Sequence, residues 1–174
     1  MTVAFNHSAF VALGSNLQDP VRQVNSALLA IEKHPNIQLV KASSLYVTAP
    51  VGYDAVQLKS VPNFINAVVE IHTDLTPLNL LHALLAIENA HGRERPFANA
   101  PRVLDCDVLL YDDAISQTTE LTLPHPRMLE RGFVMIPLLE IAPDLRIDGV
   151  PIEELIHTEL HTEMQQAIKK YEQH

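Results

Sequence analysis

The order of strand-like and helix-like segments constrains the fold of this 174-residue chain most strongly. Alternating or continuous apolar residues indicate strands, and apolar residues at helical spacing interrupt them twice. The resulting order is strand, helix, strand, strand, helix, strand, over residues 9–13, 20–34, 37–46, 64–72, 77–91 and 103–111. This is the ferredoxin-like βαββαβ pattern, and it predicts an α+β fold in which an antiparallel sheet carries helices on one face.

Capping residues mark the ends of both predicted helices. Asp19 and Thr76 each precede a proline, which is typical of an N-cap followed by the first helical residue. Pro35 stops the first helix, and Gly92 is a favourable C-terminal residue for the second.

The last third of the chain predicts a C-terminal α/β elaboration of this core. We expect a rigid turn at 124–126, a short helix over 131–141 interrupted near Pro137, a turn at 148–149 and a mostly helical segment over 152–172. No stretch has the composition of a linker, so we expect residues 1–174 to form a single domain.

Two carboxylates lie on the predicted strand over 103–111. Side chains alternate along a strand, so Asp105 and Asp107 share one face with Val103, Leu109 and Tyr111. Their Cα atoms are then roughly 6.5–7 Å apart, and the like charges repel unless a cation lies between them. Mg²⁺ favours carboxylate oxygens and substrate phosphates, and two ions about 4 Å apart fit such a pair. The alternative is a solvated edge strand, although aspartate is depleted in strands.

Arginine is concentrated beside this strand. Five of the seven arginines lie between residues 93 and 131, and no lysine occurs between Lys59 and Lys169. The planar guanidinium group binds phosphate in a bidentate manner, which lysine cannot do. We interpret this segment as a phosphate-binding region. The alternative is a surface ion-pair network with Glu88, Glu94 and Glu130.

Three further features point to ligand binding. Phe64 and Asn66 share a strand face. There the Phe64 ring can stack on a flat heterocycle, and the Asn66 amide can form hydrogen bonds with it. The alternative is an ordinary half-buried strand. His125 lies between two prolines and can donate a hydrogen bond to phosphate, unless it serves only the turn. The long loop over 48–62 suits a lid, or else a tolerated surface insertion.

Charge and composition narrow the class of protein. A net charge of −9 argues against nucleic-acid binding. The one cysteine, Cys106, allows no internal disulfide, and its place among apolar residues predicts a core position. We find neither a signal-peptide pattern nor an apolar run near the roughly 20 residues that span a membrane. We therefore expect a cytoplasmic monomer without membrane contact.

The sequence also resembles a known family. The run A-P-R-V-L-D-C-D-V-L-L-Y over 100–111 is similar to the signature of the 6-hydroxymethyl-7,8-dihydropterin pyrophosphokinases of folate synthesis. The resemblance covers nearly the whole chain in the same order, through V-A-L-G-S-N-L at 11–17, S-S-L-Y-V-T-A-P at 43–50, N-F-I-N-A-V-V-E at 63–70, G-R-E-R at 92–95 and L-P-H-P-R-M-L-E-R-G-F at 123–133.

This resemblance implies a reaction and a set of site residues. The pterin hydroxymethyl oxygen attacks the β-phosphorus of ATP, and AMP leaves. Asp105 and Asp107 match the residues that hold two Mg²⁺ ions, and with Arg93 and Arg102 they form the catalytic set. The implied ATP-binding residues are Glu88, Arg95, Val108, Thr122, His125 and Arg131. The implied pterin-binding residues are Thr48, Ala49, Val51, Phe64, Asn66 and Phe133, of which Phe64 and Phe133 would stack on the pterin.

The chain departs from the common family pattern near the predicted ATP site. Ala98 and Asn99 replace a basic and an aromatic residue, Ala100 replaces a glycine, and Glu120 stands where a basic residue is frequent. The loop over 48–62 is also longer than in compact members.

Two other functions compete with this interpretation. One is a kinase or nucleotidyltransferase that uses the same aspartates for another acceptor, which would form ADP or pyrophosphate instead of AMP. The other is a ferredoxin-like ligand-binding module without catalysis, which would not need the paired aspartates.

Overall fold

The computed structural model describes residues 4–50, 54–92, 103–160 and 167–173, and a six-stranded antiparallel sheet runs through it. The sheet strands, in the order β10-β3-β4-β1-β5 with β2 also paired to β4, are β1 (His7–Ser15), β2 (Ile37–Ala42), β3 (Tyr46–Thr48), β4 (Phe64–Thr73), β5 (Asp105–Tyr111) and β10 (Lys169–Lys170). The helices are α1 (Pro20–Glu32), α2 (Pro77–Ala90), α3 (Gly132–Ile141) and α4 (Ile152–Glu159), with a short 3₁₀ turn at Gln57–Lys59. Two small hairpins pair β6 (Ser116–Gln117) with β7 (Thr122–Leu123) and β8 (Arg146–Ile147) with β9 (Val150–Pro151).

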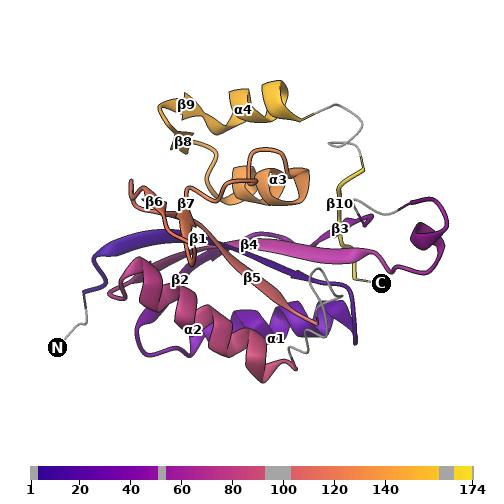
Figure 1. Cartoon of the computed structure of the whole chain (residues 1–174), viewed down its shortest axis with the longest axis horizontal. Coiled ribbons are helices and arrows are strands. Elements are labelled where there is room, and N and C mark those ends of the chain that lie inside the picture. Colours follow the sequence, from indigo (N-terminus) through magenta and orange to yellow (C-terminus); the bar gives the residue numbers. More distant parts are fainter. Residues whose placement is uncertain (1–3, 51–53, 93–102, 161–166, 174) are drawn as a thin grey trace.

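The sheet lies between two helical layers (Figure 1). Helices α1 and α2 cover one face, where they bury a core that includes Val11, Leu13 and Val69 of the sheet. Helices α3 and α4 lie over the other face and bury a second core around Phe10 and Val68. The predicted α+β, ferredoxin-like core with an elaboration is confirmed, and the elaboration covers the face that the core helices leave open.

The predicted N-caps are present. The Asp19 carboxylate accepts a hydrogen bond from the Arg22 N–H, and the Thr76 hydroxyl accepts one from the Asn79 N–H, both at 3.3 Å. Each cap satisfies a backbone donor that the first turn of a helix leaves without a partner. These local contacts explain why both helix starts could be predicted.

The strand predicted over residues 37–46 is in fact two strands. Ser43 interrupts it, because its N–H donates to Val68 O at 2.9 Å while its hydroxyl accepts from Val68 N at 3.0 Å. Strand β2 ends before this break, and β3 begins after it as a separate partner of β4. The side chain of Ser43 thus replaces a backbone partner, which residue alternation alone does not reveal.

One prediction for the C-terminal third is wrong, and another holds only in part. Helix α3 continues through Pro137, because Met135 and Leu138 are fully buried and this packing outweighs the missing backbone donor. The segment predicted to be mostly helical over 152–172 is helical in its first part, where α4 runs to Glu159, whereas Lys169–Lys170 form an edge strand.

A register shift changes the predicted faces of β5. The shift lies between Phe10 and Val11 of β1, which pair with Leu110 and Val108. Tyr111 therefore lies in the first core and not on the face of the two aspartates, whereas Leu109 lies in the second core. A β-bulge reverses the side-chain alternation beyond it, and its position depends on the partner strand.

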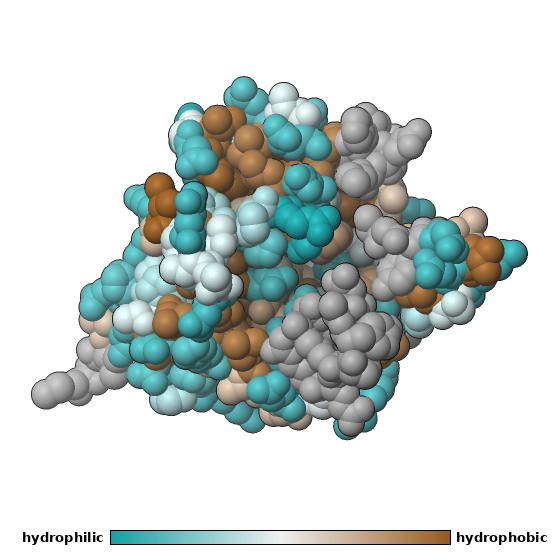
Figure 2. Space-filling view, viewed as in Figure 1, coloured by the Kyte–Doolittle hydropathy of each residue, from teal (hydrophilic) through white to brown (hydrophobic). Residues whose placement is uncertain are grey.

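The surface is mixed in polarity. Figure 2 shows that hydrophobic residues on this side of the molecule form separate groups among hydrophilic ones. None of the helices within the described ranges combines the length and apolarity required to cross a bilayer.

Candidate active site

Three neighbouring strands bring the main candidate residues into one row. Gly14 of β1 pairs with Asn66 of β4 on one side and with Asp105 of β5 on the other. One step along β1, Ala12 pairs with Asp107. Directly opposed residues of antiparallel strands share a face. Both carboxylates and the Asn66 amide therefore lie on the sheet face that α1 and α2 do not cover.

Small residues at the centre of this row leave space beside the polar groups. A side chain at Gly14 would place its Cβ 3.0 Å from Asn66 Oδ1, closer than normal packing tolerates. Ala12 carries the next smallest side chain beside Asp107. Larger residues would fill the surface between Asn66 and the carboxylates.

The two aspartates supply carboxylate oxygens of the kind that bind a divalent cation. Asp105 and Asp107 are half-buried on alternate positions of β5, with the buried Cys106 between them. In the part of the chain that is described, no group of three or more His, Cys, Asp or Glu side chains is placed to hold a metal ion. A pair of carboxylates nevertheless suits Mg²⁺, which commonly keeps waters and binds substrate phosphates in its remaining positions.

Glu88 supports the strand that carries these aspartates. Its side chain is 2 % exposed, and its Oε1 accepts a hydrogen bond from the Cys106 N–H at 2.8 Å. Because β5 is an edge strand, this backbone donor has no neighbouring strand to bind, and α2 supplies the acceptor. Burial, followed by the charges of Glu88, Asp105 and Asp107, raises the pKa of the Cys106 thiol well above its usual value. Cys106 is therefore a core residue, as predicted, and not a nucleophile.

His125 lies within electrostatic range of Asp105, and its backbone and its ring both make hydrogen bonds. Its N–H donates to Leu109 O at 2.9 Å, and its Nδ1 accepts from the Arg127 N–H at 3.2 Å. Burial and the Arg131 charge lower the pKa of His125, although the Asp105 charge opposes this effect. The ring is therefore neutral at pH 7, with its proton on Nε2, where it can donate to a ligand.

Four of the predicted pterin residues, Thr48, Phe64, Asn66 and Phe133, lie on β3, β4 and α3. Thr48 and Asn66 are both 5 % exposed, and Asn66 Nδ2 donates to Thr48 Oγ1 at 2.8 Å, which fixes the orientation of the amide. Phe64 pairs with Thr48 and is half-buried. At the N-terminus of α3, the guanidinium of the capping residue Arg131 lies 5.7 Å from the centre of the Phe133 ring, a cation–π contact.

The remaining candidates differ in what the structure shows of them. Ala49 is exposed, and Thr122 is half-buried on β7. Val108 points into the first core, so its side chain does not reach a ligand and only its backbone is available. Arg93, Arg95, Arg102 and Val51 lie outside the described residues, as do the departures Ala98, Asn99 and Ala100.

Sequence reasoning missed the residues that connect the ends of the two long loops. The buried Ser15 hydroxyl donates to Val103 O, just after the arginine-rich segment. Asn16 Nδ2 donates to Pro62 O at 3.5 Å, at the end of the other loop. Both residues belong to the V-A-L-G-S-N-L motif, and their small polar side chains directly after a strand were the available signal.

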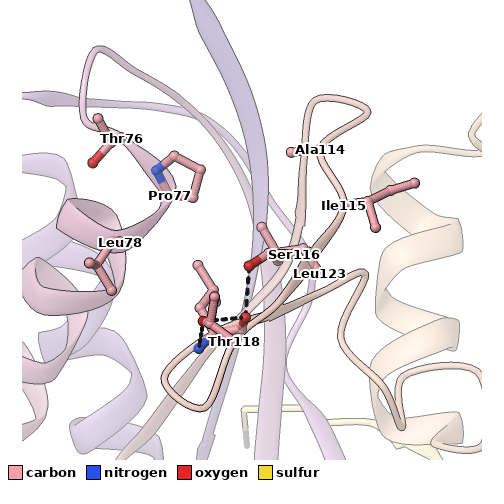
Figure 3. Close-up of a pocket in the computed structure, with 9 residues that line it drawn as sticks. Thr76, Pro77, Leu78, Ala114, Ile115, Ser116, Thr118 and Leu123 are labelled. Atoms are coloured by element: carbon pink, nitrogen blue, oxygen red, sulfur yellow. Dashed lines mark hydrogen bonds between the residues drawn. The ribbon is translucent and has the colours of Figure 1, made fainter.

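An apolar pocket of about 280 Å³ lies elsewhere, between the start of α2 and the β6–β7 hairpin (Figure 3). Its lining is mostly apolar and includes Pro77, Leu78 and Ile115. None of the candidate site residues lines it. The pocket therefore has no place in the chemistry inferred for the row of Asn66, Asp105 and Asp107.

Comparison with known protein families shows to which family this chain is related. Residues 10–143 match the sequence model of the family described as 7,8-dihydro-6-hydroxymethylpterin-pyrophosphokinase (HPPK). The chain belongs to this family. The chain is also 45 % identical over 148 residues to a 2-amino-4-hydroxy-6-hydroxymethyldihydropteridine pyrophosphokinase of Pseudomonas aeruginosa, covering 84 % of this chain and 88 % of that protein. For the enzyme of the same name from Haemophilus influenzae, the identity is 46 % over 138 residues, covering 79 % of this chain and 83 % of that protein.

Longer proteins contain a similar segment. The folic acid synthesis protein fol1 of Schizosaccharomyces pombe is 36 % identical over 165 residues, which cover 95 % of this chain but 20 % of that protein. A solved HPPK–DHPS structure in complex with substrates superimposes with a TM-score of 0.71 at 13 % identity, covering 96 % of this chain and 47 % of the other. At that identity the match shows the shared fold alone, and this chain spans about half of the solved protein.

Proposed function

We propose that this chain transfers the pyrophosphoryl group of ATP to the hydroxymethyl oxygen of 6-hydroxymethyl-7,8-dihydropterin and releases AMP. Membership of the HPPK family carries the proposal, and two bacterial relatives that match most of their length bear the name of this enzyme. The chain is a diphosphotransferase of folate biosynthesis. In the reaction, the pterin oxygen bonds to the β-phosphorus, the bond from that phosphorus to the α-phosphate oxygen breaks, and the hydroxyl proton passes to solvent.

We assign cation binding to Asp105 and Asp107, and we infer two Mg²⁺ ions bound with ATP. Their common face, their partial burial and the small residues beside them support this assignment. Bound Mg²⁺ would neutralise phosphate charge and make the attacking hydroxyl more acidic. The Nε2–H of His125 donates to a phosphate oxygen in this proposal, because the ring is neutral and lies near Asp105. Arg93, Arg95 and Arg102 are assigned to the phosphates through the family resemblance.

We assign the pterin to the opposite end of the row. The bond from Asn66 to Thr48 leaves the amide carbonyl and one N–H to bind the edge of a heterocycle. Phe64 and Phe133 supply the aromatic surfaces for stacking on the flat ring system. Val51, Ala49 and the 48–62 loop complete the assigned surface through the family resemblance.

We also propose that the chain is a single domain and acts as a monomer in the cytoplasm, without binding nucleic acid or membranes. The net charge of −9 supports the absence of nucleic-acid binding. The single cysteine, the buried Cys106, forms no disulfide within the chain, which suits a reducing compartment.

Phosphorus NMR of the protein with Mg-ATP and 6-hydroxymethyl-7,8-dihydropterin tests the function. AMP should appear in step with a new diphosphate ester. ADP would indicate a simple kinase, pyrophosphate would indicate a nucleotidyltransferase, and no product from folded protein would favour a non-catalytic binding module. Each of these three results would contradict the proposal.

The assigned carboxylates are tested in the same assay. Asp105→Asn should lower the rate by roughly 10³-fold or more, because the amide retains the size of the side chain but loses the charge that holds a cation. The matched control is Asp113→Asn, which neutralises an exposed carboxylate on the turn after β5 and should leave the rate within about twofold. Equal rates for Asp105→Asn and wild type would overturn the metal assignment.

A further inference from the structure

The C-terminal segment extends the sheet beside the proposed pterin site. Residues 167–173, here called the strap, lie beyond the family match, which ends at residue 143. Lys169 and Lys170 of the strap form β10, which pairs with Val47 and Tyr46 of β3, and the Tyr171 N–H donates to Leu45 O at 2.7 Å. Strand β3 has only three residues, so the strap provides its second hydrogen-bonded neighbour.

The strap also contacts the start of α3. A side chain at the buried Gly132 would overlap with Ile168 Cδ1, so the strap packs directly on this glycine. Gly132 lies immediately before Phe133, one of the assigned pterin-stacking residues. The strap therefore contacts α3 directly beside the residue that carries that ring.

A third contact joins the strap, α3 and β3 through Glu140. The Glu140 carboxylate accepts hydrogen bonds from the Ser44 N–H at 2.6 Å and from the Tyr46 hydroxyl. Lys170 Nζ lies 3.3 Å from Glu140 Oε2. Burial raises the pKa of Glu140, but the donors on Tyr46, Ser44 and Lys170 outweigh it and lower the pKa. The Glu140 carboxylate is therefore charged at pH 7, and from α3 it contacts the strap and the residues at the start of β3 at the same time.

We propose that the strap positions the two elements that form the pterin site, with Ile168 and Lys170 as positioning residues. Strand β3 carries Thr48, which orients the Asn66 amide, and α3 carries Phe133. The strap contacts both β3 and α3 and belongs to neither, so it fixes the distance between the Asn66 amide and the Phe133 ring. This inference rests on the proposed function for the identity of the ligand.

Removal of the strap tests the proposal. A chain that ends at residue 166 should bind the pterin about tenfold more weakly and show a similarly raised KM for it, because two binding groups are no longer held in register. Its KM for ATP and its kcat at saturating pterin should stay within about twofold of wild type, since Asp105 and Asp107 lie on β5 at the other edge of the sheet. A purely structural role would reduce the folded fraction and so lower the apparent kcat while leaving the KM for pterin unchanged, and that result would overturn the proposal.

Point variants provide the test if the shortened chain does not fold. Gly132→Ala should weaken pterin binding several-fold by displacing Ile168, and adding Ile168→Ala should restore part of that loss by removing the overlap. Lys170→Met should weaken pterin binding by about twofold to threefold, as expected for an exposed ion pair. Lys169→Met is the control, because this exposed neighbour contributes the same backbone pairing. Unchanged pterin affinity in both Gly132→Ala and Lys170→Met would overturn the proposal.

Pterin affinity is measured by the ligand's fluorescence, independently of turnover. A wild-type chain that binds pterin but forms no AMP would contradict the proposed function and still allow the strap to be tested. A wild-type chain that binds no pterin would overturn both.

Discussion

The burial and protonation of single residues at the site depend on the groups that surround them. Glu88 is buried because α2 places its carboxylate against the backbone of β5, and Cys106 is inert because it is buried beside three carboxylates. His125 is neutral because burial and Arg131 disfavour its charged form. Burial, which depends on the folded chain, is the largest cause of the pKa shifts of Cys106 and His125, and the neighbouring charges add to it or oppose it.

The lowered pKa of His125 predicts a pH-dependent contribution to stability. As the pH falls through about 6.5, the unfolded chain binds a proton at this residue before the folded chain does. This contribution to the free energy of unfolding is therefore present above that pH and is lost below it. His125→Gln should reduce the difference in unfolding free energy between pH 7.5 and pH 5.5, measured by urea denaturation. An equal difference in wild type and variant would contradict the assignment.

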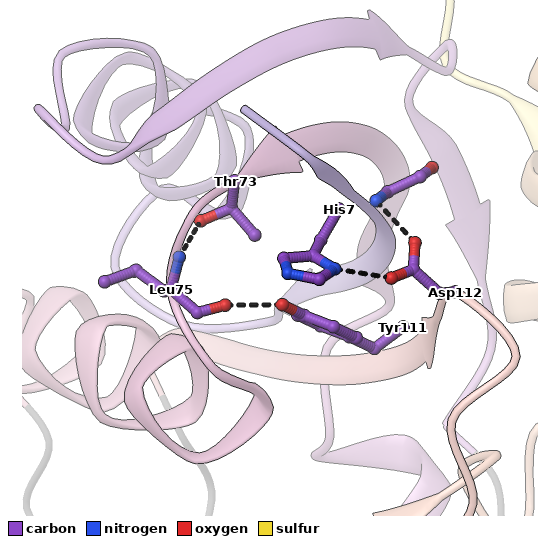
Figure 4. Close-up of polar contacts among 6 residues, drawn as sticks. His7, Thr73, Leu75, Tyr111 and Asp112 are labelled. Atoms are coloured by element: carbon purple, nitrogen blue, oxygen red, sulfur yellow. Dashed lines mark hydrogen bonds and ion pairs between the residues drawn. The ribbon is translucent and has the colours of Figure 1, made fainter. Parts of the chain in front are cut away.

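At the scale of elements, β1 joins two different ends of the sheet. One end carries Gly14 between Asn66 and Asp105. At the other end, His7 Nδ1 lies 2.7 Å from Asp112 Oδ2, and the Ser8 N–H donates to Asp112 Oδ1 at 2.8 Å (Figure 4). Figure 4 also shows the Tyr111 hydroxyl donating to Leu75 O at 2.5 Å, which ties β5 to the segment before α2. We expect the Gly14 end of β1 to serve catalysis and the His7 end to serve the stability of the fold.

Tyr111→Phe tests whether the His7 end of β1 contributes to stability but not to catalysis. The variant should lose about 0.5–1.5 kcal/mol of unfolding free energy, because the partly buried hydrogen bond from Tyr111 to the Leu75 carbonyl is removed. Its kcat and KM values should not change, since Tyr111 is about 20 Å along the strand from Asp105. Tyr171→Phe, at a residue 37 % exposed, is the matched control and should change stability by less than about 0.5 kcal/mol. A catalytic defect in Tyr111→Phe with wild-type stability would refute this division.

The whole molecule places one sheet between two cores, and the candidate site uses the face shared with α3 and α4. The exposed large hydrophobic residues of the described chain lie at several places, which include Leu29 on α1, Val56 and Leu58 on the loop before β4, and Leu78 and Ile115 around the apolar pocket. Stable dimers usually bury a contiguous surface of about 1,200–2,000 Å². The scattered distribution, seen on one side of the molecule in Figure 2, supports a monomer.

Sedimentation velocity tests the oligomeric state. We expect the mass of a single chain at micromolar concentrations, with and without Mg-ATP. Charge repulsion from the net charge of −9 also disfavours association at low salt. A species with twice that mass at micromolar concentration would contradict this expectation.

The sequence predicted those parts of the fold that depend on local patterns. The capping residues Asp19 and Thr76 satisfy donors within their own helices, and the ferredoxin-like order follows from residue periodicity. The break at Ser43 and the bulge before Val11 could not be predicted, because each depends on the backbone of a partner strand. The site assignments to Asp105, Asp107 and Asn66 stay predictions, although the structure places all three on one face.

The sequence by itself determined the spacing of the aspartates, the starts of the two core helices and the family, because these depend on neighbours in the chain. Only the tertiary structure decided that Gly14 separates Asn66 from Asp105, that Glu88 supports β5, and that the strap lies on β3. Strand order and the docking of the C-terminal segment bring together residues that are more than 100 positions apart in the sequence, such as His7 with Asp112 and Lys170 with Tyr46. Such contacts depend on the free energy of the complete fold, which no local pattern contains.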